Sequence, residues 1–532
     1  MRAYACILLG CLAAANIMAV PARRGWQTKN LSDGREISVC LVGDEYYHFW
    51  QTADGKIALP QNDGTFVLSD ETAPTPEEIR ARKKASPMFA EQPHKIGTPN
   101  LAPRGLVILA AYQDVDFQTE NTQVAMSEML NKEGYDYNGA TGSAADYFKA
   151  QSNGQYSPIF DVVGPVVLPN NRAYYGANTS KPGTDIRPDE MIVDACTAVD
   201  EQVDFSQYDS NNDGKIDLVY VIYAGKGEAD GGPAESIWPH RWTAYGTFDG
   251  KSLHDYACSG ELEGFNDDNK RNGIGTICHE FGHVIGLPDY YDTNYKTNYD
   301  AGLTPNDWNV MDQGCYNNDG KTPPNYSIFD KYFIGWATPK FLAKDDQQFI
   351  QMTTDYNDAY QITGSSALVP YYSTDTVLYI ENRQPEGWDT YLPGHGMIVW
   401  QVVYDQDAWD NNVPNNTANK PRLTLLAADG NLMIGNIVEQ GVTLHEGKSD
   451  PFPGTANIEA FYAFTGCELT DIQETDGVIK FSFNGAEDPA MEIGDCKLEI
   501  GNCKVLIDGQ VFIIRQNDTY TIYGQKITTF NN

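Results

Sequence analysis

Eleven consecutive residues, HEFGHVIGLPD at 279–289, leave little freedom in how the middle of this chain can fold. Residues four positions apart lie on one face of a helix, so His279 and His283 can bind the same metal ion. Gly286 tolerates a positive φ and lets the chain turn back sharply after the helix. Asp289, ten residues after His279, can then return to that ion. Three protein ligands with one open position are typical of a catalytic zinc site.

Two neighbouring acids complete this interpretation. Glu280 stands where the motif places a general base, which accepts a proton from the attacking water and later donates it to the leaving amine. Asp292 is the alternative third ligand. In a chain with only eight histidines, an H-E-x-x-H pattern arises by chance on the order of one time in a hundred. The spacing therefore predicts a zinc peptidase site.

A glycine-flanked segment, NVMDQG, follows the motif and places Met311 in a tight turn. Such a methionine turn is expected beneath a metal-binding helix of this kind. Tyr316 lies just beyond it and is a candidate donor to the oxyanion that develops on the substrate. The alternative for Tyr316 is a tyrosine packed on the surface.

The charge of the chain excludes one class of partner. Its 532 residues include 37 basic and 73 acidic side chains, and the formal net charge is -36. So acidic a protein repels phosphate backbones, which argues against nucleic acid as a partner. We interpret the acidity as a well-solvated surface, with some of the carboxylates bound to calcium.

The segment YDSNNDGKIDLVYV resembles a calcium-binding loop. Side chains that carry oxygen recur at alternate positions, at Asp209, Asn211, Asp213 and Asp217. Gly214 supplies the sharp bend that such loops need. The twelfth position is Tyr220 rather than glutamate, so the loop is not a regular EF-hand. The alternative is an Asx-rich turn that holds no metal.

The N-terminus predicts export. Residues 1–22 combine an early charge, an apolar run and small residues, with Ala19 or Ala22 at the cleavage site. LLGC around Cys11 could instead be a lipoprotein cleavage box, which would anchor the protein to a membrane. No other long apolar run occurs, so no transmembrane span is expected. We expect a secreted or cell-surface protein.

The sequence predicts a multidomain α+β protein. The expected order is a signal peptide (1–22), a β-rich propeptide with a linker (23–100), a catalytic domain (101–345), a β-sandwich (346–487) and a short C-terminal β module (488–532). Helical spacing alternates with buried strands before about residue 345, and short strands separated by turns follow it. The basic cluster Arg82–Lys84 marks either a protease-sensitive junction or a solvated helix face.

Long strings of the sequence carry a family resemblance. They include DYFKAQSNGQYSPIFDVVGPV, YDSNNDGKIDLVYVIYAG, HEFGHVIGLPDYYDT, NVMDQGCYNN and DPFPG. Over roughly residues 100–480 the chain resembles the secreted immune inhibitor A family of zinc metallopeptidases. The resemblance implies a metzincin-like catalytic domain with His279, His283 and Asp289 on zinc and Met311 beneath it. It also implies a following β domain, bound calcium and synthesis as a zymogen.

These observations lead to one hypothesis and two alternatives. We expect a secreted zinc-dependent endopeptidase that hydrolyses extracellular proteins and is held latent by its own propeptide. The alternatives are a catalytically silent surface binding or adhesion protein, and a protease directed at glycoproteins or mucins. Latency could come from a Cys40 thiolate on the metal, from a propeptide carboxylate or from steric cover. For Cys40 a buried structural role is the favoured interpretation, because it lies inside the predicted strand ISVCLV.

Overall fold

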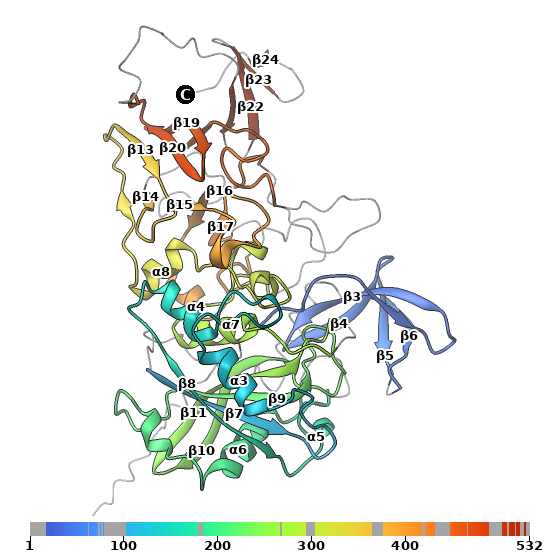
Figure 1. Cartoon of the computed structure of the whole chain (residues 1–532). Coiled ribbons are helices and arrows are strands. Elements are labelled where there is room, and N and C mark those ends of the chain that lie inside the picture. Colours follow the sequence, from blue (N-terminus) through green and yellow to red (C-terminus); the bar gives the residue numbers. More distant parts are fainter. Residues whose placement is uncertain are drawn as a thin grey trace, which may run out of the picture.

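The computed structural model has four β-sheets, with the helices gathered around one of them (Figure 1). It describes residues 18–61, 63–72, 75, 78, 103–178, 185–265, 269–293, 304–363, 376–417, 421–430, 447–464 and 466–488, and the strand segments 503–507, 510–515, 518–521 and 526–527. Among these residues, no helix has both the length and the apolar character needed to cross a bilayer. Most of the predicted signal peptide, residues 1–17, lies outside them.

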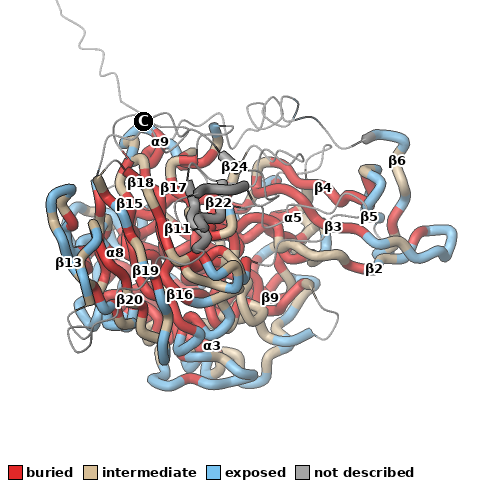
Figure 2. Tube along the Cα trace, turned by 90° about the horizontal axis from the view of Figure 1, so that it is seen from above, coloured by how far each residue is buried: buried red, intermediate tan, exposed pale blue. Residues whose placement is uncertain are grey.

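The first sheet is a five-stranded meander that projects to one side of the molecule (Figure 1). Its strands are β2 (Gln27–Asn30), β3 (Glu36–Asp44), β4 (Tyr47–Thr52), β5 (Lys56–Pro60) and β6 (Phe66–Thr72). Its far end is largely exposed, whereas β3 and β4 are buried where they meet the rest of the protein (Figure 2). This placement agrees with a separate β-rich unit, and its role as a propeptide stays a prediction.

A six-stranded mixed sheet forms the centre of the next part of the chain. Its strands, in spatial order, are β1 (Met18–Ala19), β10 (His240–Phe248), β11 (Lys251–Leu262), β9 (Val219–Lys226), β7 (Arg104–Ala111) and β8 (Ile159–Val167). The four strands from β11 to β8 are parallel neighbours, and β10 joins their edge antiparallel. The last partner, β1, pairs antiparallel with β10 and comes from the extreme N-terminal part of the described chain.

Both faces of this sheet are covered, which explains the near-continuous apolar strands in the sequence. In β7, Val107 and Leu109 point to one core, whereas Leu106 and Ile108 point to the other. The covering helices are α3 (Thr122–Asn131), α4 (Ala144–Gln151), α5 (Arg172–Gly176), α6 (Pro188–Val199) and α7 (Gly275–Val284). Residues of α6 belong to the core on one face, and those of α3, α4 and α7 belong to the core on the other.

Two further sheets enclose a third core. One contains β12 (Lys340–Phe341), β14 (Tyr360–Thr363), β15 (Val377–Arg383), β16 (Gly396–Val402) and β17 (Leu423–Leu425). The other contains β13 (Gln348–Met352), β20 (Val478–Phe483), β19 (Cys467–Thr475), β18 (Ala460–Phe464), β21 (Cys503–Ile507), β22 (Gln510–Arg515), β23 (Asp518–Thr521) and β24 (Lys526–Ile527). Alternate residues of β15 and β16, such as Leu378 and Val399, pack against residues of β19 and β20.

The opposite face of β15 and β16 packs against the part of the chain that carries α7. Tyr379, Trp400 and Trp409 belong to the same buried cluster as Phe281 of α7. The short helices α8 (Ile328–Ile334) and α9 (Gln406–Asp410) lie in this contact region. The two parts therefore share one core, so residues of the β part can reach the metal-binding motif.

The structure confirms a mixed α+β protein with several sheets. The predicted domain boundaries stay predictions. One detail bears on them, since β21 of the expected C-terminal module pairs in parallel with β18 and continues its sheet. Six cysteines whose side chains the structure describes are unpaired and buried, at Cys40, Cys196, Cys258, Cys278, Cys315 and Cys467.

Candidate active site

Helix α7 carries the motif, and all ten of its residues are buried. Small and apolar side chains surround the two histidines, as a helix packed on every side requires. The helix ends where Gly286 takes φ 102°, a left-handed conformation that favours glycine. The amide of Leu287 donates to the carbonyl of Gly282 across this turn. The chain reverses as the sequence predicts and brings Asp289 back beside the helix.

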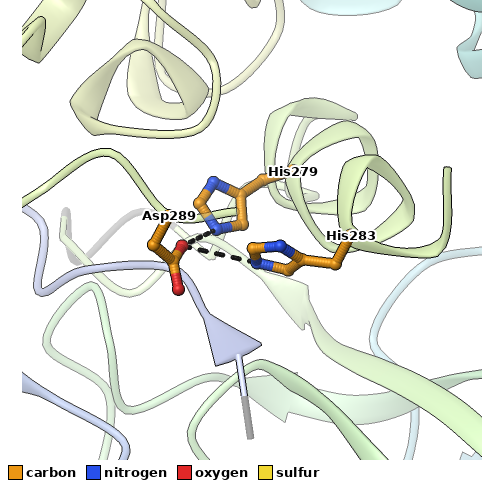
Figure 3. A group of neighbouring side chains, drawn as sticks. All are labelled: His279, His283 and Asp289. Carbon is orange, nitrogen blue, oxygen red and sulfur yellow. Dashed lines mark ion pairs between the residues drawn. The ribbon is translucent and has the colours of Figure 1, made fainter. Parts of the chain in front are cut away.

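His279, His283 and Asp289 converge on one point (Figure 3). Asp289 Oδ1 lies 3.0 Å from His279 Nε2 and 3.4 Å from His283 Nε2. Tetrahedral zinc with ligand bonds of about 2.0–2.1 Å separates its ligand atoms by about 3.3 Å. Among the described residues this is the only group of three histidine, cysteine or acidic side chains close enough to share an ion.

Buried polar atoms without hydrogen-bond partners lie at the same point, as expected where a cation binds. His279 Nε2, His283 Nε2 and Asp289 Oδ1 are buried and have no hydrogen-bond partner within the protein. Such buried polar atoms are costly unless something binds them. The donor set of two imidazoles and a carboxylate, in this geometry, fits zinc.

Each ligand is oriented by a second contact. His279 Nδ1 hydrogen-bonds the carbonyl of Val310, and His283 Nδ1 that of Leu287, both at 2.8 Å. These contacts fix the tautomers and leave each Nε2 free for a metal. Asn412, just after α9, accepts from the Asp289 amide and donates to Asp289 Oδ2, both at 2.6 Å. The β part of the chain thus positions the third ligand.

Met311 lies directly beneath the helix and is fully buried. A Cβ atom added at Gly282, between the two histidines, would stand 2.5 Å from its sulfur. The carbonyl of Met311 accepts a hydrogen bond of 2.9 Å from the amide of Tyr290, next to Asp289. The methionine turn therefore contacts the helix and the segment that carries the third ligand.

Burial dominates the electrostatics of the site. Burial, with the nearby Asp289 charge, raises the pKa of Glu280 well above its usual value. Burial also lowers the pKa of His283, which favours the neutral imidazole that binds metals. Burial alone would raise the pKa of Asp289, but the two histidines hold it well below its usual range.

The N-terminal end of the described chain runs through this site. Met18 and Ala19 pair with Arg241 and His240 of the edge strand β10, and the arrow of β1 ends close to the three ligands in Figure 3. The next amide, that of Val20, donates to Glu280 Oε1 at 3.0 Å. A segment of the same chain therefore lies at the motif as an added strand.

Side chains around the motif bind the carbonyls of this segment in succession. The hydroxyl of Tyr291 donates to Ala19 at 2.6 Å, and the indole of Trp238 donates to Val20 at 2.9 Å. Further along, the hydroxyl of Tyr316 donates to Pro21 at 2.7 Å, and Gln313 donates to Ala22 at 3.0 Å. The peptide bond between Ala19 and Val20 is thus held at its carbonyl by Tyr291 and at its amide by Glu280.

The structure brings together Glu280, the three predicted ligands and Met311, and it places Tyr316 against the same N-terminal segment that contacts Glu280. Asp292 is not a member of the ligand group. Tyr291 and Asn412 were missed. Tyr291 stands two residues after Asp289, so its position in the sequence could have drawn attention. No local pattern could have found Asn412, because 123 residues separate it from Asp289.

The predicted calcium loop lies before β9, apart from this cluster. Asp209 accepts from the amides of Asp213 at 3.0 Å and Gly214 at 3.1 Å, and from the Lys251 ammonium at 2.6 Å. Asp217 accepts from the amide of Ser210 at 2.8 Å. The loop has the turn expected of either alternative, and calcium binding stays a prediction.

Comparison with known proteins agrees with the resemblance. Residues 108–337 match the family described as immune inhibitor A peptidase M6, catalytic domain. Immune inhibitor A of Bacillus thuringiensis subsp. alesti is 30% identical over 271 residues, which cover 43% of this chain and 39% of that protein. Pre-pro-metalloprotease PrtV of two Vibrio cholerae serotype O1 strains is 28% identical over 227 residues, covering 37% of this chain and 24% of that protein.

This chain therefore spans well under half the length of these relatives. The matched region contains α7, the methionine turn and the whole six-stranded sheet except β1 and the first strand positions of β7. With its motif and its matched region in agreement, the chain carries the catalytic domain of an immune inhibitor A-like metallopeptidase.

Proposed function

We propose that this protein is a zinc-dependent endopeptidase that acts on extracellular proteins. The observation that carries this proposal is the convergence of His279, His283 and Asp289 on one point, with Glu280 beside a peptide bond in the same cleft. When bound, zinc lowers the pKa of a water ligand and polarises the carbonyl that is attacked. The adhesion alternative is not favoured, because every residue that hydrolysis requires is present.

The chain's own residues have separate tasks in this mechanism. Glu280 accepts the proton of the attacking water and passes it to the leaving amine. Its carboxylate already lies within hydrogen-bond distance of a peptide nitrogen, that of Val20. Tyr291, bound to the carbonyl of that same peptide bond, is better placed than Tyr316 to stabilise the oxyanion. Tyr316 binds the carbonyl two residues further on and positions the peptide.

We also propose that the protein is exported and made as a zymogen. Cys40 is buried, and burial raises the pKa of its thiol, which disfavours a thiolate on the metal. Steric cover is the better explanation, since the segment from Val20 to Arg23 lies over Glu280 and contacts Trp238 and Tyr316. Removal of the signal peptide after Ala19, rather than Ala22, would leave Val20 and the residues after it in place, while the pairing of Met18 and Ala19 with β10 would be lost.

The first sheet would hold this segment in the cleft. His48 of β4 forms an ion pair of 2.9 Å with Glu228, and both side chains are buried. The His48 ring also stacks on Trp238 at 4.4 Å, and Trp238 is the residue that binds the carbonyl of Val20. Trp238 of the catalytic part therefore contacts both the first sheet and the N-terminal segment.

We predict that Glu280→Ala lowers kcat for a casein or peptide substrate by about 100- to 10,000-fold, because the general base is lost. Zinc content should stay at one ion per chain, since Glu280 is not a ligand. Peptide hydrolysis and metal analysis on the same preparation test this. Activity retained by the zinc-loaded variant would refute the mechanism.

We predict different effects for the two cleft tyrosines. Tyr291→Phe should lower kcat by about 100- to 1,000-fold with little change in KM, as loss of an oxyanion donor does. Tyr316→Phe should act mainly on KM. Steady-state kinetics on one peptide compare them directly. The opposite pattern would return the oxyanion role to Tyr316, as the sequence first suggested.

We predict that Asn412→Ala weakens zinc binding by about 10- to 100-fold, because Asp289 loses both contacts that orient it. Competition with a chromogenic chelator measures this affinity. Asn411→Ala is the matched control, since the Asn411 side chain donates only to the carbonyl of Asp407 in an exposed position. Equal zinc affinity in both variants would show that the β part does not support the metal site.

We predict that removing calcium at fixed zinc lowers the melting temperature of the wild type. The acids of the loop repel one another without a cation, and calcium at about one hundred times its Kd would contribute about 2.7 kcal/mol. Asp213→Ala should abolish the difference, whereas the exposed Asp33→Ala should keep it. A wild-type melting temperature that does not respond to calcium would favour the metal-free turn.

We predict that cutting the linker within Arg82–Lys84 activates the protein. If the segment occupies the cleft about 99% of the time, the uncut protein is about a hundredfold less active. Hydrolysis rates before and after limited trypsin measure this, and a chain with glutamines at these three positions is the uncut control. Equal rates before and after cleavage would mean that the first sheet only assists folding.

A further inference from the structure

The segment in the cleft places one arginine in a site formed by the catalytic part of the chain. Arg23 Nη1 lies 2.6 Å from Glu263 Oε1, and Arg23 Nη2 lies 2.6 Å from Asp319 Oδ1. The centre of the guanidinium is 4.4 Å from the ring centroid of Phe265 and 5.8 Å from that of Tyr316. Two carboxylates and two aromatic rings thus surround a single cation.

The side chains that surround Arg23 belong to the catalytic part of the chain. Glu263 follows β11 and is buried, and the amide of Gly264 donates to Asp230 Oδ2 at 2.7 Å. The other oxygen of Asp319 pairs with Lys321 at 3.3 Å. Burial raises the pKa of Asp230 to about 6, although Arg23 acts against this shift. Asp319 is thus also held by a residue of its own domain, whereas the cation comes from the N-terminal segment.

The arrangement favours arginine over lysine. A planar guanidinium can direct two separate N–H groups at two carboxylates while its face lies against a ring. Only 12% of the Arg23 side chain is exposed, so solvent screens these contacts weakly. The next arginine, Arg24, contacts Asn306 outside this site. Gly25, at φ 139°, brings the backbone so close to Phe265 that an added Cβ would stand 2.5 Å from the ring.

The site that holds Arg23 lies at a fixed number of residues from the peptide bond that faces Glu280. Val20 presents its amide to Glu280, and Arg23 follows three residues later. The segment enters as a strand added to β10, the edge strand of the described sheet once β1 is set aside. Peptides commonly bind to sheet edges by this strand addition, with pockets for particular side chains. A substrate that binds in the same direction would place the side chain three residues after its Glu280-facing residue against Glu263 and Asp319.

We infer that Glu263, Asp319 and Phe265 form a substrate subsite for an arginine side chain, three residues after the residue whose amide faces Glu280. This inference rests on the proposed function, since it treats the cleft as a peptide-binding site. The prosegment fills the subsite with Arg23 in the latent protein. After activation, the same residues select an arginine in the substrate. The two carboxylates of the subsite, at Glu263 and Asp319, favour a cationic ligand over a neutral one.

The test uses three peptides with the sequence of residues 16–25, in which Gln replaces Arg24. The position of Arg23 holds arginine, lysine or citrulline, and citrulline keeps the shape of arginine without its charge. With the linker-cut full chain, kcat/KM should be about tenfold or more higher for arginine than for citrulline. Lysine should fall between them.

Variants assign the preference to the named side chains. Glu263→Gln should bring the arginine-to-citrulline ratio close to one, and Asp319→Asn should lower it in the same direction. Asp319 is the more exposed of the two, so its variant covers the case in which Glu263→Gln does not fold. Asp358→Asn, which breaks an ion pair with Lys340 in the β part, is the matched control and should keep the ratio. A ratio near one in the wild type overturns the inference.

A binding measurement separates this inference from the proposed function. Fluorescent versions of the same peptides are titrated into the linker-cut Glu280→Ala protein, and Kd for the arginine peptide should be about tenfold or more lower than for citrulline. If the wild type cleaves neither peptide but this difference in Kd remains, the proposed function fails and the subsite stands. If both peptides are cleaved and bound equally, the function stands and the subsite fails. If neither peptide binds, the subsite inference is also overturned.

Discussion

His279, His283 and Asp289, which have almost no access to solvent, are held around one point, and much of the structure serves to keep them there. Val310, Leu287 and Asn412 each supply a contact that fixes one ligand. Buried polar atoms that face one another without a hydrogen bond destabilise a fold unless a cation binds them. Metal binding and the stability of this core are therefore linked, and the free energy of binding adds to that of folding.

The close contact between Gly282 and Met311 shows why the helix and the following turn have to fit together. A Cβ atom at Gly282 would stand only 2.5 Å from the Met311 sulfur, so a larger residue there would displace the Met311 side chain. The turn in which Met311 lies also contacts Tyr290, the neighbour of Asp289. A shift of this turn would move a ligand as well as the helix, so packing and chemistry are constrained by the same atoms.

The sequence predicted the parts of the site that depend on local spacing. His279, His283 and Asp289 follow from helical periodicity and a glycine turn, and both features act within eleven residues. Asn412 could not be predicted, because its contact with Asp289 depends on how two sheets pack. The path of the N-terminal segment was also missed. The apolar run before it indicated a signal peptide, and no periodicity indicates that Val20 pairs with Glu280, 260 residues away.

The path of that segment follows from a property of the central sheet. Without β1, strand β10 is an edge with unpaired backbone groups, and such edges readily bind another strand. In this structure Met18 and Ala19 pair with this edge, and the next residue, Val20, donates its amide to Glu280. A peptide that replaced these residues would form similar backbone contacts, so the proposed substrate would use the edge that Met18 and Ala19 occupy here. Specificity is then left to the side-chain pockets, of which the Arg23 site is the most strongly charged contact that the segment makes.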